Sequence, residues 1–253
     1  MTTSAATREG DEERDGNALR GGVWVAPRDN PPHAEPSGVA WEQLQHLPTR
    51  TYARGDFVYR TGDLADGFYV LLEGRVKLSL PDPVRGERVV AVCGEGDLFG
   101  ATAYGQEQRH HAEAVSLVDG TRVTSLSCTA FEELAQERSH TAIFLIQVLA
   151  ARVQTLEEEA EYASLPVQAR LARTLLQLAQ KFGGEVAPGI YDLQIELRQN
   201  EIASLAGATR VSATEALGAW RSMGIVSGTR GHYQIDTRRL STLLELLEAD
   251  YRR

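Results

Sequence analysis

Small residues are dense between Leu205 and Val226, in a stretch whose apolar spacing is otherwise helical. Ala206, Gly207 and Ala208 are consecutive, and four further Ala and Gly residues follow within a few helical turns. Small side chains allow two helices to cross closely, and glycine permits the positive φ of a sharp turn. The stretch therefore predicts two short helices joined by a tight turn, in the manner of a helix-turn-helix.

The second of these helices has one apolar face and one polar face. Thr209 is placed to cap its first turn, and Ala213, Ala216, Leu217 and Trp220 recur at helical spacing and predict the core side. An arginine at the entering end can donate to a guanine edge, and hydroxyl and amide groups can fix the register on phosphates. The candidate DNA contacts are therefore Gln199, Asn200, Thr209, Arg210, Val211, Ser212, Thr214 and Glu215.

The segment "GIVSGTRGHYQID" follows the second helix and predicts a β-hairpin, or wing, with Arg230 and His232 near its tip. A last helix is expected after Asp236, which would cap it. An ordinary helical hairpin with small residues at its crossing is the structural alternative. The wing and its basic tip favour double-stranded DNA as the partner, and they add Arg230 to the candidate contacts.

The charge distribution bears on this prediction. The net charge of −9 argues by itself against a nucleic-acid partner. However, residues 1–165 carry 15 Arg and Lys against 26 Asp and Glu, whereas residues 166–253 carry 11 against 9. Local potential governs phosphate contact, so the C-terminal part remains compatible with DNA binding.

A long helical segment is expected from about residue 129 to 164, with a break near Ser139. Apolar residues in its second part alternate at spacings of four and three, which is a heptad seam. This seam could pack on the rest of the chain, but its regularity favours a parallel coiled coil between two copies. The candidate dimer contacts are Ile146, Leu149, Val153, Leu156 and Ala160.

Short apolar runs separated by glycines lie between Tyr52 and Ser127, and they predict an antiparallel barrel or roll around a small cavity. Leu165-Pro166 is the expected hinge, because a helix tends to stop before proline. The predicted fold is α+β. Its parts are a disordered extension (1–36), a β-roll (37–128) that starts with a short helix in "GVAWEQLQHL", a dimerisation helix (129–165) and a winged helix-turn-helix domain (166–253). Within the last domain, a helix is expected through "VQARLARTLLQLAQKF", followed by a loop before the helix-turn-helix. Separate cores are expected for the roll and the C-terminal domain.

Several classes are disfavoured by what the sequence lacks. No apolar run is long enough to span a bilayer, and the N-terminal segment has no apolar signal core, so we expect a cytoplasmic protein with no membrane partner. Two cysteines indicate neither a disulfide framework nor a metal cluster. No G-x-S-x-G elbow, Walker loop or H-E-x-x-H motif occurs, so no enzyme activity is expected.

The order of roll, long helix and winged helix-turn-helix resembles the cyclic-AMP receptor protein/FNR superfamily of transcription regulators over about residues 40–235. The resemblance is carried by "GDFVYRTGDLADGFYVLLEGRVKL", "GEGDLFG", "RLARTLLQLA" and the helix-turn-helix. It implies a homodimer that binds an inverted-repeat site near promoters and contacts RNA polymerase.

The chain departs from the members that bind cyclic AMP. Ala101 stands where they have a ribose-binding Glu, and His110 follows Arg109 where they have an Arg-Ser pair. Leu156 and Glu157 replace the Thr and Ser that reach the adenine. Cyclic AMP is therefore disfavoured. The metal cluster of FNR is also disfavoured, because it needs N-terminal cysteines. Haem is disfavoured because His110 and His111 are adjacent in a predicted strand and point to opposite faces, so at most one could face the cavity.

The segments "FGATAYGQEQRHHAEAV" and "LAARVQTLE" are more similar to the nitrogen-control branch, which senses 2-oxoglutarate. This resemblance implies a dicarboxylate effector held by arginines. Arg152 and Glu157 also fit the g and e′ positions of a coiled coil, where they would pair without any ligand, so an effector-free regulator is equally open. A sensor that acts through protein partners without DNA is the alternative function. The effector-binding candidates are Phe99, Gly100, Ala101, Arg109, His110, Arg152 and Glu157.

Overall fold

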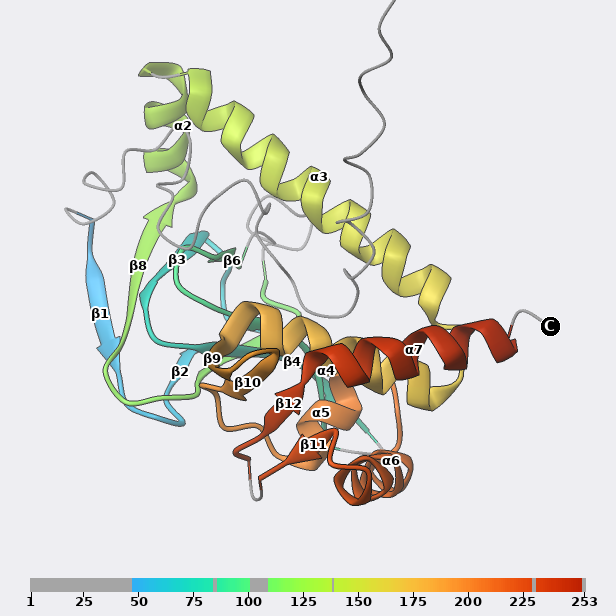
Figure 1. Cartoon of the computed structure of the whole chain (residues 1–253). Helices are drawn as coiled ribbons and strands as arrows, with labels where there is room; N and C mark the ends of the chain where they lie inside the picture. The colour runs from blue at the N-terminus through green and yellow to red at the C-terminus, as the bar shows by residue number, and fades with distance from the viewer. Residues whose placement is uncertain (1–46, 84–85, 101–108, 138, 229–230, 252–253) are drawn as a thin grey trace, which may run out of the picture.

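The computed structural model describes residues 47–83, 86–100, 109–137, 139–228 and 231–251 (Figure 1). The extension expected over residues 1–36 lies outside these ranges, and so does nearly all of the helix expected in "GVAWEQLQHL".

Two four-stranded antiparallel sheets form the N-terminal half, which confirms the expected roll. One sheet has the order β1 (Thr49–Tyr52), β8 (Thr121–Ser127), β3 (Gly67–Glu73) and β6 (Leu98–Phe99). The other has the order β2 (Phe57–Tyr59), β7 (Glu113–Ser116), β4 (Val76–Asp82) and β5 (Gly86–Cys93). An apolar core that includes Phe68, Leu71 and Val76 is shared by strands of both sheets.

Two helices follow the roll and break where the sequence indicated. α2 (Cys128–Glu137) ends just before α3 (Ser139–Tyr162), which has 24 residues. At 1.5 Å per residue α3 is about 36 Å long, and in Figure 1 it runs diagonally past the roll toward the end of α7. Five large apolar side chains of α3 are between 45% and 64% exposed: Ile143, Ile146, Leu149, Val153 and Leu156.

The C-terminal half begins with α4 (Val167–Phe182), directly after Pro166. A four-stranded sheet, ordered β11 (Val226–Ser227), β12 (Gln234–Asp236), β10 (Ile190–Leu193) and β9 (Gly183–Ala187), joins α4 to the other helices. These helices are α5 (Gln199–Leu205), α6 (Arg210–Ser222) and α7 (Thr237–Tyr251). Asp236 caps α7 as predicted, since its Oδ1 accepts from the Arg239 backbone N–H at 3.0 Å.

The β9–β10 hairpin replaces part of the loop expected before the helix-turn-helix. Its strands have only five and four residues. Most of their side chains are half-buried, so buried and exposed residues do not alternate as they do in a typical strand. Gly189 makes the turn with φ +80°. The hairpin extends the wing sheet, in which β10 pairs with β12.

Each half has its own apolar cluster, but the cluster of the C-terminal half also includes residues of the roll. Val89 and Val92 of β5 belong to the same apolar cluster as α4 and α5, while Ala91 and Cys93 of β5 belong to the core of the roll. A register shift in the β4–β5 pairing skips Val90 and allows this division. β5 is therefore covered on both faces, by the roll and by the C-terminal half.

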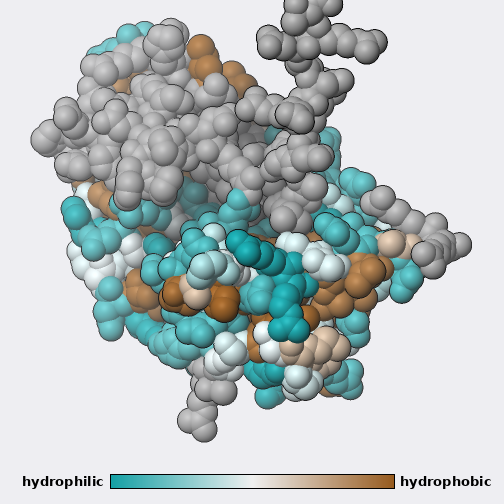
Figure 2. Space-filling view, in the orientation of Figure 1, coloured by the Kyte–Doolittle hydropathy of each residue, from teal (hydrophilic) through white to brown (hydrophobic). Residues whose placement is uncertain are grey.

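Figure 2 shows a mainly hydrophilic described surface in this orientation, with a hydrophobic area over α7. Leu246 of α7 is 61% exposed. None of the helices within the described ranges is long and apolar enough to cross a membrane.

Candidate nucleic-acid interface

The turn between α5 and α6 has the geometry predicted for a helix-turn-helix. Gly207 adopts φ +59° and donates its N–H to the Ser204 carbonyl, and the Ala208 N–H donates to the Ala203 carbonyl at 2.8 Å. On α6, the small and apolar residues predicted for the core are buried: Ala213, Ala216, Leu217 and Trp220. The small residues therefore serve a close crossing of the two helices, as expected.

The start of α6 is stabilised by its own hydroxyl groups. The Thr209 Oγ accepts the Ser212 backbone N–H at 3.1 Å, and the two hydroxyl oxygens lie 3.0 Å apart. Thr209 is thus the N-cap that the sequence predicted. The remaining free N–H groups and the helix dipole make this end of α6 favourable for a phosphate group.

The outward face of α6 presents the expected side chains to solvent. Arg210, Thr214 and Glu215 are exposed, and Val211 is 66% exposed. At the start of α5, Asn200 is also exposed, while Gln199 is half-buried. The wing residue Arg230 lies outside the described residues.

A hydrogen bond that the sequence did not predict connects the two helices on this side. The Thr214 hydroxyl lies 3.0 Å from Gln199 Oε1 and 2.8 Å from the Arg210 carbonyl oxygen. The hydroxyl has a single proton, so it donates to one of these acceptors at a time. The contact places the Gln199 amide beside the exposed face of α6.

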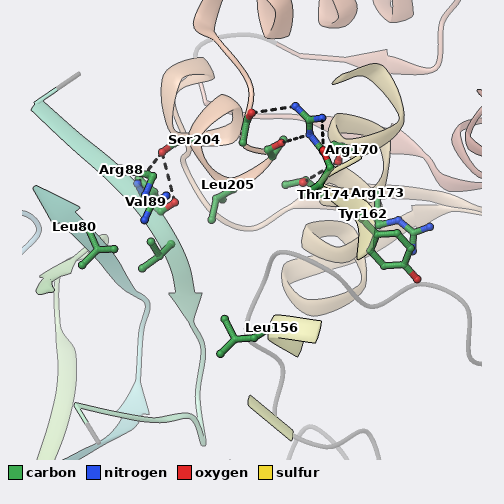
Figure 3. A pocket seen from close by; sticks show the side chains of 14 residues that line it. Leu80, Arg88, Val89, Leu156, Tyr162, Arg170, Arg173, Thr174, Ser204 and Leu205 are labelled. Carbon is green, nitrogen blue, oxygen red and sulfur yellow. Dashed lines mark hydrogen bonds between the residues drawn. The ribbon is translucent and has the colours of Figure 1, made fainter. Parts of the chain in front are cut away.

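Arg170 braces the turn against the expected hinge. Its guanidinium donates to the carbonyl groups of Ala206, at 3.0 Å, Gly207, at 3.1 Å, and Ala163, at 3.2 Å (Figure 3). It also donates to the Leu165 carbonyl at 2.6 Å. One side chain of α4 therefore ties the end of α3 to the turn before α6. No sequence pattern indicates this role, because all four acceptors are backbone atoms.

A cavity of about 520 Å³ lies beside this brace. Leu80 and Val89 line it from the roll, Leu156 from α3 and Arg170 from α4 (Figure 3). The cavity marks the junction at which the roll, α3 and the helix-turn-helix meet. Among the residues that the structure describes, none of the effector candidates lines it.

A buried ion pair joins the roll to α5. Lys77 of β4 donates from Nζ to Glu201 Oε1 at 2.9 Å and to Glu87 Oε1 at 3.0 Å. The side chains of Lys77 and Glu201 are only 10% and 9% exposed. Burial works to lower the pKa of Lys77, but the hydrogen bonds and charges of Glu201 and Glu87 outweigh it and raise that pKa. Lys77 is therefore held as a cation.

Some residues expected at an effector site lie inside an aromatic cluster of the roll. The His110 ring stacks on Tyr59 with centroids 3.7 Å apart, and Phe99 stacks on Tyr69 with centroids 5.5 Å apart. Gly100 has φ +78°, and a Cβ built on it would lie 2.6 Å from Tyr69 Cδ2. Burial lowers the pKa of His110, although the nearby carboxylates of Asp63 and Asp66 oppose the shift.

The other effector candidates are placed differently. Arg109 is exposed and donates to the Gly62 carbonyl at 2.7 Å. Glu157 is exposed on α3, and Arg152 lies on the same helix. Ala101 falls outside the described residues. The structure thus brings Phe99, Gly100 and His110 together and leaves Glu157 on the outer surface of α3.

Comparison with known proteins decides the family. The family model for a cyclic nucleotide-binding domain matches residues 49–138, and the one for a Crp-like helix-turn-helix domain matches residues 169–246. The "CRP-like cAMP-activated global transcriptional regulator" of Mycobacterium tuberculosis is 30% identical over 191 residues, which cover 75% of this chain and 84% of the relative. The chain belongs to the CRP/FNR superfamily of transcription regulators.

Another relative of this CRP/FNR protein is the "Global nitrogen regulator" of Synechocystis, which is 30% identical over 193 residues, or 74% of this chain and 84% of the relative. Solved structures confirm the fold. CooA from Carboxydothermus hydrogenoformans gives a TM-score of 0.64 at 20% identity, with 82% of this chain and 92% of that chain covered. The c-di-GMP-responsive global regulator CLP of Xanthomonas campestris gives 0.63 at 20% identity, with 76% and 95% covered.

These relatives are transcription regulators, and the CRP/FNR chain described here is a DNA-binding transcription regulator and not an enzyme. The relatives named for cyclic AMP and for nitrogen control match it at the same identity. Sequence identity alone therefore does not favour either kind of effector.

Proposed function

We propose that this regulator binds an inverted-repeat promoter site as a homodimer and that it recruits RNA polymerase, as the family resemblance implies. Each subunit would consist of the roll, the dimerisation helix and the winged domain that the sequence predicts. The observation that carries the DNA contact is the outward face of α6, which is exposed from Arg210 to Glu215 except at the buried Ala213 and half-buried Ser212. A helix of this kind enters the major groove with its N-terminal residues on the base edges.

The apolar side of α3 supports the proposed homodimer. Ile146, Leu149, Val153 and Leu156 are about half exposed or more in the single chain, and exposed apolar surface on one helix side marks a contact. Their heptad spacing matches a parallel two-stranded coiled coil. Ala160 extends the same seam toward the hinge.

Each candidate DNA contact has a chemical role in this proposal. Arg210 donates to a guanine edge, and Val211 contacts a thymine methyl group. Glu215 accepts from a cytosine amino group, or orients Arg210. Gln199, Asn200, Thr209, Ser212, Thr214 and Arg230 contact or position groups on the phosphate backbone.

Selection of bound DNA from a random pool would test the proposal, followed by affinity measurements with the selected site. Arg210→Ala should weaken binding by about 1–3 kcal/mol and relax base preference at one position of each half-site. Arg210→Lys is the matched control, because it keeps the charge but loses the bidentate geometry. It should retain the salt dependence and lose the base preference. An Arg210→Ala protein with unchanged affinity and preference would remove Arg210 from the interface.

For the effector, we propose a dicarboxylate of the 2-oxoglutarate type, bound by Arg109 with Arg152 and Glu157 of the partner subunit. An effector-free regulator is the competing candidate, and the packing of Phe99 and His110 among aromatic rings supports it. Affinity for the selected DNA, measured with and without 2-oxoglutarate and cyclic AMP, separates the two. A response to neither compound supports the effector-free regulator.

The alternative function is a sensor that acts through protein partners without DNA. It predicts that selection enriches no sequence and that no salt-dependent DNA binding is measured. The exposed arginine at the start of a capped α6 favours the DNA-binding function over this alternative.

A further inference from the structure

The contact between the roll and α5 involves buried charges with defined partners. Lys77 and Glu201 are 124 residues apart in sequence, and their hydrogen bond crosses from β4 to α5. Beside it, the Val89 backbone N–H of β5 donates to the Ser204 hydroxyl at 2.8 Å (Figure 3). The first helix of the helix-turn-helix is thus attached to the roll at two points along its length.

Glu201 has a second task at the start of α5. Its Oε2 accepts the Arg198 backbone N–H at 2.8 Å, while its Oε1 accepts from Lys77. The carboxylate that closes the first turn of α5 is therefore the same one that the roll holds. Gln199 and Asn200 belong to this turn, so the residues expected on phosphates lie next to the anchored carboxylate.

A buried charged pair at this place is better suited to fixing the position of α5 than to stabilising the fold. Removing two charges from water is costly, and a well-packed apolar pair is often as stable as a buried ion pair. The apolar contacts of Val89 and Val92 could slide, because the hydrophobic effect has no direction. Hydrogen bonds from Lys77 to Glu201 and Glu87 fix one position of α5 on the sheet.

We propose that Lys77 is a positioning residue for DNA binding, which acts through Glu201 to hold each helix-turn-helix at a fixed place on its roll. The inference rests on the proposed function, because the two α6 helices of a dimer must match two half-sites at once. In a dimer joined through α3, fixing each domain on its roll fixes the separation of the two α6 helices. Lys77 is too buried to contact phosphate itself.

The test compares a selected inverted repeat with a DNA that contains a single half-site. Lys77→Met keeps the length of the side chain and removes the cation. The second reading helix then searches a larger volume, which lowers its effective concentration at the second half-site. We expect affinity for the inverted repeat to fall about tenfold or more, while affinity for the half-site stays within about twofold of the wild type. The dependence of the binding constant on salt concentration should not change.

Two further variants separate positioning from folding. Lys77→Arg should restore most of the preference for the inverted repeat, because it can donate to both carboxylates. Glu201→Gln keeps a capping side chain at the third position of α5 but loses the charge, and it should behave like Lys77→Met. Unchanged half-site binding in both variants would show that the domain is folded.

The matched control is Arg54→Met. Arg54 of the roll pairs with Glu196 of the C-terminal half, so this pair crosses the same boundary, but the two side chains are 50% and 41% exposed. An exposed pair contributes little, and Arg54→Met should bind both DNAs as the wild type does.

Any one of three results with the variants would overturn the inference. Lys77→Met could bind the inverted repeat as tightly as the wild type, it could lose half-site and inverted-repeat affinity equally, or Arg54→Met could cause the same loss. A wild-type protein that selects no DNA would instead remove the proposed function, and this inference with it. A wild type that binds both DNAs equally would overturn the positioning role alone.

Discussion

Replacing Ile146 with serine tests whether α3 pairs with a second copy of the chain. Full burial of an isoleucine side chain contributes roughly 1.5–3 kcal/mol. Ile146 is 64% exposed in the single chain, so covering it contributes about 1–2 kcal/mol per subunit, or about 2–4 kcal/mol in a symmetric dimer. The dissociation constant should therefore rise about 30-fold to 700-fold, at about 1.4 kcal/mol per factor of ten.

Sedimentation over a range of concentrations measures this change. The matched control is Leu246→Ser on α7, because Leu246 is also an apolar helical residue with 61% exposure but is not part of the seam on α3. It makes the same kind of change to helix propensity and exposed surface. If Ile146→Ser dimerises as tightly as the wild type, or if Leu246→Ser dissociates equally, the seam does not form the dimer.

Two further predictions concern the aromatic cluster of the roll. Gly100→Ala should destabilise the protein by about 1–3 kcal/mol more than Gly62→Ala in denaturant unfolding, because both have positive φ but only Gly100 faces Tyr69 closely. Equal losses would mean that Tyr69 moves freely. Burial lowers the pKa of His110 in the folded protein, so its contribution to stability is present above the unfolded value of about 6.5 and is lost as the pH falls below it. His110→Phe should therefore show a smaller loss of unfolding free energy from pH 7.5 to 5 than the wild type, and an identical pH profile would contradict the assignment.

The helix-turn-helix could be predicted from the sequence because its determinants are local. The cap Thr209 and its partner Ser212 are three residues apart, and Gly207 meets the need for a positive φ within the same turn. The buried side of α6 follows from helical periodicity alone. Local chemistry of this kind can be read directly from a printed sequence.

The contacts between the two halves could not be predicted in this way. Lys77 and Glu201 look like ordinary surface charges in a chain with many of them, and only the fold brings them together. Arg170 is equally inconspicuous, because its partners are backbone carbonyls. The hairpin β9–β10 was missed because its short strands lack clear alternation, and its pairing with β12 depends on residues more than forty positions away.

The two covered faces of β5 have a consequence for how such a regulator can evolve. Recombination at Leu165-Pro166 would replace the DNA-binding domain but keep β5, whose Val89 and Val92 pack against the original domain. Point substitutions on the outward side of α6 meet no such constraint, because Val211 and Glu215 are exposed and belong to neither apolar cluster of the described residues. Operator preference in this lineage should therefore diverge through single residues of α6, while α4, α5 and β5 are inherited together as one unit.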